Sequence, residues 1–339
     1  MLGIGVIGYG YWGPNLVRNF ADLPNARVVT VCDLDERRRS IAERRHPGVK
    51  TTDNPGELAN DTSIDAIVIA TPVSSHFELA LQAIKADKHV LVEKPLTATA
   101  DEARRLLDEA EKRRRVVMVD HTFLYTGAVQ KIHDIIASGE LGEIYYYDSV
   151  RVNLGLFQHD VSVLWDLAVH DLSIMDYLLP ARATAVSATA MSHVANQPEN
   201  IAYLTVYFDG PQIGHVHVNW LAPVKVRRTL IGGSSKMIVY DDLEPSEKVK
   251  IYDKGITIDD SDENRRQMLI GYRTGDMMSP KIAQTEALQG LAREFVASIE
   301  EKRKPLTDGG LGLRVVQILE AATRSLAEHG RPVELQLTE

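Results

Sequence analysis

The first 122 residues of the chain alternate short apolar segments with amphipathic ones, and this alternation constrains the fold more than any other feature. The apolar segments have the length of buried strands and lie at residues 2–8, 26–32, 64–70, 89–93 and 116–119. The segments between them have helical periodicity and lie at residues 12–22, 35–45, 78–86 and 100–114. Regular alternation of strand and helix predicts an α/β fold with a doubly wound parallel sheet.

The pattern changes after residue 122, where strand-like segments begin to follow one another with only turns between most of them. These segments lie at 144–152, 184–191, 201–208, 213–221, 226–231 and 236–240. Helices are expected around them, at 128–137, 164–179, 283–302 and 310–329. Consecutive strands without helices between them predict a large, mostly antiparallel open sheet. With 339 residues, the chain is long enough for an α/β domain at 1–122 and an α+β domain at 123–339.

The first apolar segment runs directly into a glycine-rich loop with the sequence GYGYWG at residues 8–13. Gly8 permits a tight turn, Gly10 lets the backbone approach a pyrophosphate, and Gly13 lets the next helix pack closely against the strand. The amides at the start of that helix would face a phosphate. A turn that serves packing alone is the alternative. The strand–loop–helix context nevertheless predicts a Rossmann dinucleotide site, lined also by Tyr11 and Trp12.

The expected partner of the glycine loop is an acidic residue at the end of the second strand. Asp33 lies 20 residues after the last loop glycine, where a carboxylate meets the ribose hydroxyls of an adenosine. This carboxylate favours NAD over NADP, because it would repel a 2′-phosphate. Arg37 and Arg38 are close enough in sequence to keep NADP as the less favoured cofactor. Thr71 and Pro72, at the end of the third strand, are expected to line the adenine or ribose side.

A lysine follows the fourth strand, within the sequence Glu93-Lys94-Pro95. Parallel strands of an open sheet end at one edge, and ligands bind there. Lys94 is therefore expected beside the dinucleotide, with Glu93 as a further residue of the cofactor site. An ammonium stabilises developing alkoxide charge, so this placement suggests a nicotinamide-dependent dehydrogenase whose substrate alcohol lies next to the lysine. His121 and Tyr125, after the last strand of this domain, are further candidates for the same cleft.

Asp166 and His170 lie four residues apart in a predicted helix, which places both side chains on one face, one turn apart. Oxidising an alcohol releases a proton to a base whose pKa should be near the working pH, and histidine suits this task. A carboxylate can orient a sugar hydroxyl or hold the imidazole. The alternative is an ordinary helical pair. Asp171 is the competing carboxylate, and we expect it to form a structural hydrogen bond.

Metal chemistry is not required by these residues, and the sequence shows no zinc-type cluster of ligands. His215, His217 and Asn219 alternate along one predicted strand and so share a face of the sheet. A polar subunit interface explains this stripe better than a metal site does. The predicted site therefore contains no metal.

Composition excludes several other classes of partner. The formal charge of −9 argues against non-specific binding to nucleic acid. No apolar run approaches the roughly 20 residues that span a bilayer, which argues against a membrane protein. The start of the chain has no basic region before its apolar residues, so we expect the first strand there and not a signal peptide. The single cysteine, Cys32, cannot form an internal disulfide, which favours the cytoplasm.

The glycine loop, the Glu93-Lys94-Pro95 motif and the Asp166–His170 pair, in that order, resemble the Gfo/Idh/MocA oxidoreductases over nearly the whole chain. The resemblance implies that Lys94 and His170 are the catalytic pair, that Asp166 contacts the substrate, and that the cofactor is NAD or NADP. Members act on small molecules, namely sugars, inositols and sugar nucleotides. Many assemble through the open sheet, so a homodimer or homotetramer is expected.

A finer resemblance concerns Arg151 and Asn153, the segment around Asp166, and Arg273. These segments are similar to those of members that oxidise UDP-N-acetylglucosamine-type sugars at carbon 3. The resemblance implies that Arg151, Asn153 and Arg273 contact substrate or its diphosphate, because arginine binds phosphate bidentately. Interface or surface ion pairs are the alternatives for these residues. A nucleotide-sugar dehydrogenase is thus the leading hypothesis, ahead of an inositol or free-sugar dehydrogenase and of a non-catalytic NAD-binding sensor.

Overall fold

A computed structural model describes residues 1–155, 161–253, 255–258 and 270–336. The chain forms two compact units, of which the first contains residues 1–126 and 285–320 and the second contains residues 127–284 and 321–339. The chain therefore passes from the first unit to the second after residue 126, returns at 285 and leaves again after 320. The predicted fold class is confirmed, with a parallel sheet in the first unit and a mostly antiparallel sheet in the second.

The sheet of the first unit has six parallel strands in the order β3-β2-β1-β4-β5-β6. Its strands are β1 (Leu2–Ile7), β2 (Ala26–Cys32), β3 (Lys50–Thr52), β4 (Ala66–Ile69), β5 (His89–Glu93) and β6 (Val117–Asp120). The direction of winding reverses between β1 and β4, and open sheets of this kind bind ligands at that point, outside the carboxyl ends of the strands. Strand β3 was not predicted, because its sequence Lys-Thr-Thr is short and polar.

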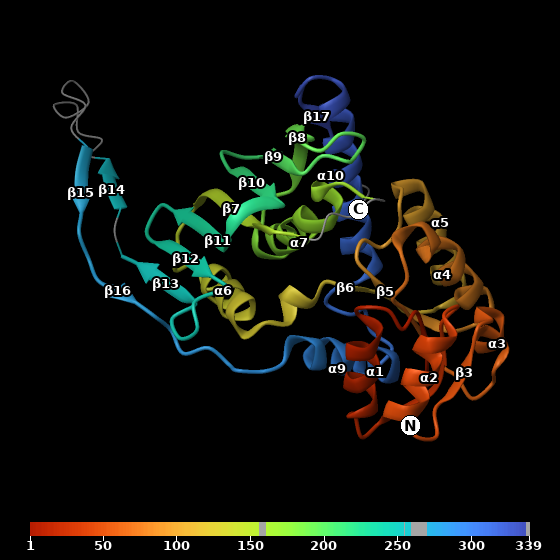
Figure 1. Ribbon diagram of the computed structural model, residues 1–339. Helices are drawn as coiled ribbons and strands as arrows, with labels where there is room; N and C mark the ends of the chain where they lie inside the picture. Colours follow the sequence, from red (N-terminus) through yellow and green to blue (C-terminus); the bar gives the residue numbers. More distant parts are fainter. Residues whose placement is uncertain (156–160, 254, 259–269, 337–339) are drawn as a thin grey trace. The chain divides into compact units, whose positions relative to one another are not determined.

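Helices cover both faces of this sheet. They are α1 (Gly13–Ala21), α2 (Glu36–Arg45), α3 (Pro55–Asn60), α4 (His76–Lys85), α5 (Ala100–Arg113), α9 (Ala287–Glu300) and the larger part of α10 (Gly309–Ala327), with 3-10 turns η1 (Val73–Ser75) and η2 (Thr122–Tyr125). Helix α1 buries Leu16, Val17 and Phe20. Phe20 meets Phe295 of α9 edge to face, with ring centroids 6.1 Å apart. Helix α9 therefore packs beside α1, and its apolar side chains belong to the same hydrophobic core as those of strand β1 (Figure 1).

The sheet of the second unit has nine strands in the order β16-β13-β12-β11-β7-β10-β9-β8-β17. They are β7 (Ile144–Leu154), β8 (Ala183–Met191), β9 (Ile201–Phe208), β10 (Ile213–Asn219), β11 (Leu221–Gly233), β12 (Met237–Asp241), β13 (Val249–Tyr252), β16 (Met277–Met278) and β17 (Val333–Glu334). A separate hairpin pairs β14 (Gly255–Ile258) with β15 (Ile270–Arg273). Neighbouring strands are antiparallel except β7 and β10, which run parallel because a helix and two strands separate them in sequence.

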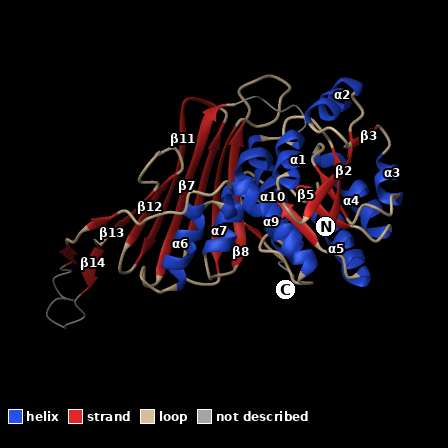
Figure 2. Cartoon of the chain, turned by 90° about the horizontal axis from the view of Figure 1, so that it is seen from below, coloured by secondary structure: helices blue, strands red, loops and turns tan. Residues whose placement is uncertain are grey.

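One face of this sheet is covered by helices and the other is not. Along β9, Ala202, Leu204 and Val206 are buried, whereas Tyr203 and Tyr207 on the opposite face are exposed. The helical elements are α6 (Gly127–Ala137), η3 (Leu164–Ala168), α7 (Val169–Leu178) and the end of α10, and Figure 2 shows α6 and α7 along one side of the sheet. Across the described residues, we find no helix both long enough and apolar enough to cross a membrane.

Candidate active site

The glycine loop has the geometry that a dinucleotide requires. Gly8 has φ of +95°, and a Cβ there would lie 2.5 Å from the carbonyl oxygen of Ala70. A Cβ on Gly13 would lie 2.1 Å from the carbonyl oxygen of Gly8, so the helix can pack this closely only on glycine. A Cβ on Gly10 would meet no backbone, since its nearest neighbour is the Arg38 guanidinium at 3.4 Å. The protein therefore leaves the face of Gly10 open, as the close approach of a pyrophosphate demands.

Asp33 is fixed at the end of β2 by the same loop. Its carboxylate accepts hydrogen bonds from the backbone N–H of Tyr9 at 2.6 Å and of Asp35 at 2.9 Å. The Arg38 guanidinium, which is half exposed, lies 3.6 Å from it. The carboxylate is thus held beside the glycine loop, where the sequence predicts a contact with ribose hydroxyls. Arg38 is the cation that a 2′-phosphate would meet first.

The remaining predicted cofactor residues lie around this loop within the first unit. Tyr11 is 90% exposed and stacks on Trp12, with ring centroids 6.1 Å apart. The Thr71 hydroxyl accepts a hydrogen bond from Ser75 at 2.7 Å, and Pro72 precedes η1. Tyr11 therefore offers an uncovered ring at the loop, whereas Thr71 is held in the turn that follows β4.

Strands β5 and β6 bring a set of titratable groups together at their carboxyl ends. Glu93 and Asp120 are paired residues of these neighbouring parallel strands. Burial raises the pKa of Glu93 well above its usual value, and the Asp120 charge raises it further. Burial also raises the pKa of Asp120. Burial lowers the pKa of His121 to about 3, aided by the Lys94 charge, so this imidazole is neutral. Lys94 thus lies among two protonatable carboxyls and an uncharged histidine.

His76 holds the segment that carries Lys94, a role that the sequence did not predict. Its ring nitrogens lie 2.8 Å from the carbonyl oxygens of Thr71 and Pro95. The side chain is buried, and burial lowers its pKa. The imidazole therefore ties the end of β4 to the residue after Lys94.

In the second unit, Asp166 lies in the π-helical turn η3 and His170 in the first turn of α7. Single π turns in helices are frequent at functional sites. The Trp220 indole N–H donates to Asp166 Oδ2 at 3.2 Å, and this tryptophan is only 1% exposed. A Cβ on Gly155 would lie 2.6 Å from the indole ring, so Gly155 gives Trp220 its space. Trp220 is therefore a residue that positions Asp166, and no motif in the sequence marks it.

Asp171 anchors α7 to the sheet, in agreement with its expected structural role. Its carboxylate accepts hydrogen bonds from the Ser149 hydroxyl at 2.6 Å and from Arg151 Nε at 2.6 Å. The Tyr147 hydroxyl donates to the Asp171 backbone oxygen at 3.2 Å. These three partners alternate along β7 and so share the face that the helix covers. The anchor fixes the turn that contains His170.

Arg151 and Asn153, two of the three residues predicted to contact a diphosphate, lie on β7. Arg151 is buried, and Asp171 raises its pKa against the opposing effect of burial. This ion pair occupies Arg151 Nε and Nη2 and ties β7 to α7. Asn153 donates weakly to the Leu154 carbonyl oxygen at 3.4 Å. Arg273 pairs with Gly255 through its backbone, and its side chain lies outside the described residues.

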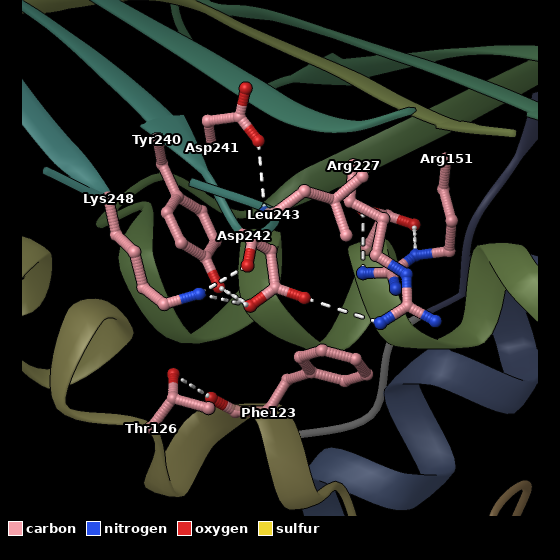
Figure 3. Close-up of polar contacts among 10 residues, drawn as sticks. Phe123, Thr126, Arg151, Arg227, Tyr240, Asp241, Asp242, Leu243 and Lys248 are labelled. Carbon is pink, nitrogen blue, oxygen red and sulfur yellow. Dashed lines mark hydrogen bonds and ion pairs between the residues drawn. The ribbon is translucent and has the colours of Figure 1, made fainter. Parts of the chain in front are cut away.

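A second arginine next to Arg151 also forms an ion pair. Arg227 is the partner of Arg151 across strands β7 and β11, and it lies 3.3 Å from Asp242 (Figure 3). Asp242 also contacts Lys248 at 3.6 Å and accepts a hydrogen bond from the Tyr240 hydroxyl at 3.1 Å. Despite burial, these contacts lower the pKa of Asp242. In this part of the sheet, the cations Arg227 and Lys248 share the Asp242 carboxylate.

The histidine stripe on β10 lies on the uncovered face of the sheet. The His217 ring stacks on Tyr203 with centroids 4.3 Å apart, and His215 Nδ1 lies 3.6 Å from Asp148. Within the part of the chain that the structure describes, no group of three or more His, Cys, Asp or Glu residues could hold a metal ion. His215 and His217 thus contact other side chains of the same sheet.

Comparison with known proteins identifies the family. Residues 2–121 match the oxidoreductase family with an NAD-binding Rossmann fold, and residues 129–239 match the GFO/IDH/MocA C-terminal domain. The chain belongs to the GFO/IDH/MocA family. This membership makes it an oxidoreductase with an NAD site, in agreement with the glycine loop and Asp33.

Individual relatives place the chain near sugar and polyol dehydrogenases. The chain is 28% identical to scyllo-inositol 2-dehydrogenase (NAD(+)) of Bacillus subtilis, over 70% of this chain and 72% of the relative. Its fold is similar to UDP-N-acetylglucosamine 3-dehydrogenase GnnA from Acidithiobacillus ferrooxidans, with a TM-score of 0.79, 24% identity, and coverage of 96% of this chain and 99% of the other. It is also similar to levoglucosan dehydrogenase in complex with NADH and levoglucosan, with a TM-score of 0.83, 21% identity, and coverage of 99% and 100%. The structural likenesses establish the fold.

Proposed function

We propose that this GFO/IDH/MocA protein is a cytoplasmic dehydrogenase that oxidises a hydroxyl of a sugar or polyol with NAD. The observations that carry the proposal lie within each unit separately. The first unit has a glycine loop shaped for a dinucleotide and Lys94 after β5, and the second has the Asp166–His170 pair, with Asp166 held by Trp220. A protein that only sensed NAD would need the loop but not the other groups.

Each side chain has a separate task in this proposal. His170 takes the hydroxyl proton, because imidazole is a base near neutral pH. The Lys94 ammonium stabilises the negative charge that develops on the same oxygen. Asp166, with one carboxylate oxygen engaged by the indole, orients a hydroxyl of the substrate. The loop from Gly8 to Gly13 and Asp33 would hold NAD, which accepts the hydride from the carbon.

For the substrate, we favour a free polyol or sugar over a nucleotide sugar. The ion pair with Asp171 occupies two nitrogens of Arg151, one of the three residues predicted to contact a diphosphate. A free polyol needs only neutral hydrogen bonds, and the relative in Bacillus subtilis is named for an inositol. The UDP-linked amino sugar remains the second candidate, supported by the local resemblance around Asn153 and Arg273 and by the likeness to GnnA.

The decisive experiment is a substrate panel with purified protein, followed by the absorbance of NADH. The panel contains myo-inositol, scyllo-inositol, glucose, UDP-N-acetylglucosamine and N-acetylglucosamine. The proposal expects turnover of a free polyol or sugar that exceeds turnover of every UDP-sugar. Faster oxidation of UDP-N-acetylglucosamine, with a sharp rise in KM when UDP is removed, would replace it with the second candidate. Lys94→Ala protein is the control for contaminating dehydrogenases.

We further propose that the uncovered sheet face forms a homodimer or homotetramer interface. Tyr203, Tyr207 and Ile213 are between 38% and 45% exposed on neighbouring strands, together with the stacked His217. Large exposed apolar patches commonly mark protein–protein interfaces. Light scattering should give a mass of at least twice 37.7 kDa, and Tyr203→Glu should reduce it. A monomeric wild-type protein would contradict this assignment.

A further inference from the structure

Two carboxyl groups meet at the carboxyl ends of β5 and β6. Glu93 and Asp120 are Cα partners in a parallel pair, so their side chains leave the sheet on the same side. Asp120 is only 2% exposed. Two ionised carboxylates in such a place would repel one another, and proteins relieve this by keeping a proton on one of them.

The contacts of Asp120 fix its position without neutralising it. The Trp12 indole N–H donates to Oδ2 at 2.9 Å, and the Thr122 hydroxyl donates to Oδ1. Both donors are uncharged. Trp12 belongs to the glycine loop, so the carboxyl pair is tied to the cofactor site. The contacts select one position for the Asp120 carboxylate and leave its charge to be balanced by other groups.

Several charged and titratable groups surround the carboxyl pair. Lys94 follows Glu93 on the β5 side, and its charge stabilises the ionised form of both carboxyls. Burial lowers the pKa of His121, which directly follows β6, and of His76 on α4. Tyr125 of η2 is neutral, since burial raises its pKa. Among these groups, Lys94 is the cation whose charge acts on both carboxyls.

His121 gives a second, independent sign that this cluster serves a ligand. Its side chain is 1% exposed, and neither ring nitrogen has a hydrogen-bond partner among the described residues. Buried polar groups without partners are rare in native proteins and call for an explanation. A polar group from outside the chain, such as an amide or hydroxyl of a ligand, would satisfy it. The carboxyl pair thus adjoins a position that is prepared for a polar ligand.

We propose that Glu93 and Asp120 hold one proton between them and present a single negative charge to Lys94. This inference rests on the proposed role of Lys94 in alcohol oxidation. The two carboxyls are positioning residues, which act through Lys94 and do not touch the reacting atoms. The shared charge faces the Lys94 side chain and orients it. Two charges would pull Lys94 toward the pair, and loss of both would remove this counter-charge.

The proposal makes an unusual prediction for amide variants. In Glu93→Gln or Asp120→Asn the amide replaces the protonated member, and the remaining carboxyl ionises, so the charge facing Lys94 is unchanged. Only the double variant removes it. The double variant should lose at least ~20-fold more kcat than either single variant, because only the double variant loses the nearby counter-charge in a site of low dielectric. The alkaline limb of the pH–kcat profile should move to lower pH in the double variant alone.

A measurement without substrate tests the shared proton directly. Carboxyl carbons are followed by ¹³C NMR over a pH titration of the full protein, and the Glu93 signal is identified by its loss in Glu93→Gln. Glu93 should titrate well above the usual range for glutamate. Asp120→Asn removes the neighbouring negative charge and should lower that midpoint. Asp101→Asn, at a side chain 76% exposed on α5, is the matched control and should leave it unchanged.

The two tests separate this inference from the proposed function. The shared proton is ruled out if the Glu93 signal titrates in the ordinary range. It is also ruled out if the midpoint of that signal does not change in a folded Asp120→Asn variant. Losses in the single variants as large as in the double variant also overturn it, because the charge count would then be irrelevant. Failure of every sugar and polyol as substrate would instead refute the proposed function, and the NMR titration would still decide the inference.

Discussion

The buried ion pair between Arg151 and Asp171 offers the sharpest test of how the second unit is built. The Arg151 Nε and Asp171 Oδ2 atoms are 2.6 Å apart, and the side chains are 6% and 3% exposed. Asp171→Asn removes the carboxylate charge and leaves a guanidinium buried with no counter-charge from this partner. Breaking such a pair costs ~3–5 kcal/mol, because the remaining charge keeps its desolvation penalty. That loss is a large fraction of the ~5–15 kcal/mol that stabilises a typical domain.

Urea unfolding followed by far-UV circular dichroism measures this cost. Arg151→Met/Asp171→Asn removes both charges, so it should be more stable than Asp171→Asn alone by ~2 kcal/mol or more. The matched control is Asp101→Asn, which breaks an exposed pair of 3.9 Å with Arg105. That pair should contribute less than ~1 kcal/mol, because solvent screens it.

The reasoning would be refuted if Asp171→Asn cost no more than the exposed control, or if the double variant lost the sum of both single effects. The same variants also test whether Arg151 binds the diphosphate of a UDP-sugar. If Arg151 bound a diphosphate, Arg151→Met would raise KM for a UDP-sugar and leave the free energy of unfolding nearly unchanged. Loss of stability without that selective effect supports the packing role.

Three further predictions concern the active site. Asp33→Ala should weaken NAD binding more than NADP binding in calorimetry, and a wild-type preference for NADP would contradict the role of Asp33. Lys94→Ala and His170→Ala should each lower kcat by about two orders of magnitude or more. Their double variant should lose less than the product, since the groups act as a unit. Trp220→Phe should lower kcat/KM by ~10-fold with NAD affinity unchanged, because it removes one hydrogen bond to Asp166; unaltered kinetics would show that the indole is not needed.

The local pattern of the sequence predicted most of the fold. Strands and amphipathic helices must bury their apolar sides. The spacing of apolar residues in the sequence shows which sides these are. The glycine loop was equally visible, because a left-handed φ at Gly8 and the close packing at Gly13 exclude other residues. The sequence did not predict that α9 packs against α1 in the first unit. The apolar face of a helix predicts that the helix packs against another element, but it does not identify that element.

The partners of polar side chains were decided only by the tertiary structure. In the sequence, Arg151 has the same appearance as an arginine that binds phosphate, whereas β7 places it against Asp171. Trp220 is 54 residues from Asp166, and nothing local links them. Glu93 and Asp120 meet because β5 and β6 are neighbours in the sheet. Hydrogen bonds and ion pairs act over a few ångströms in space, so the strand order and register that bring such groups together determine what each can do.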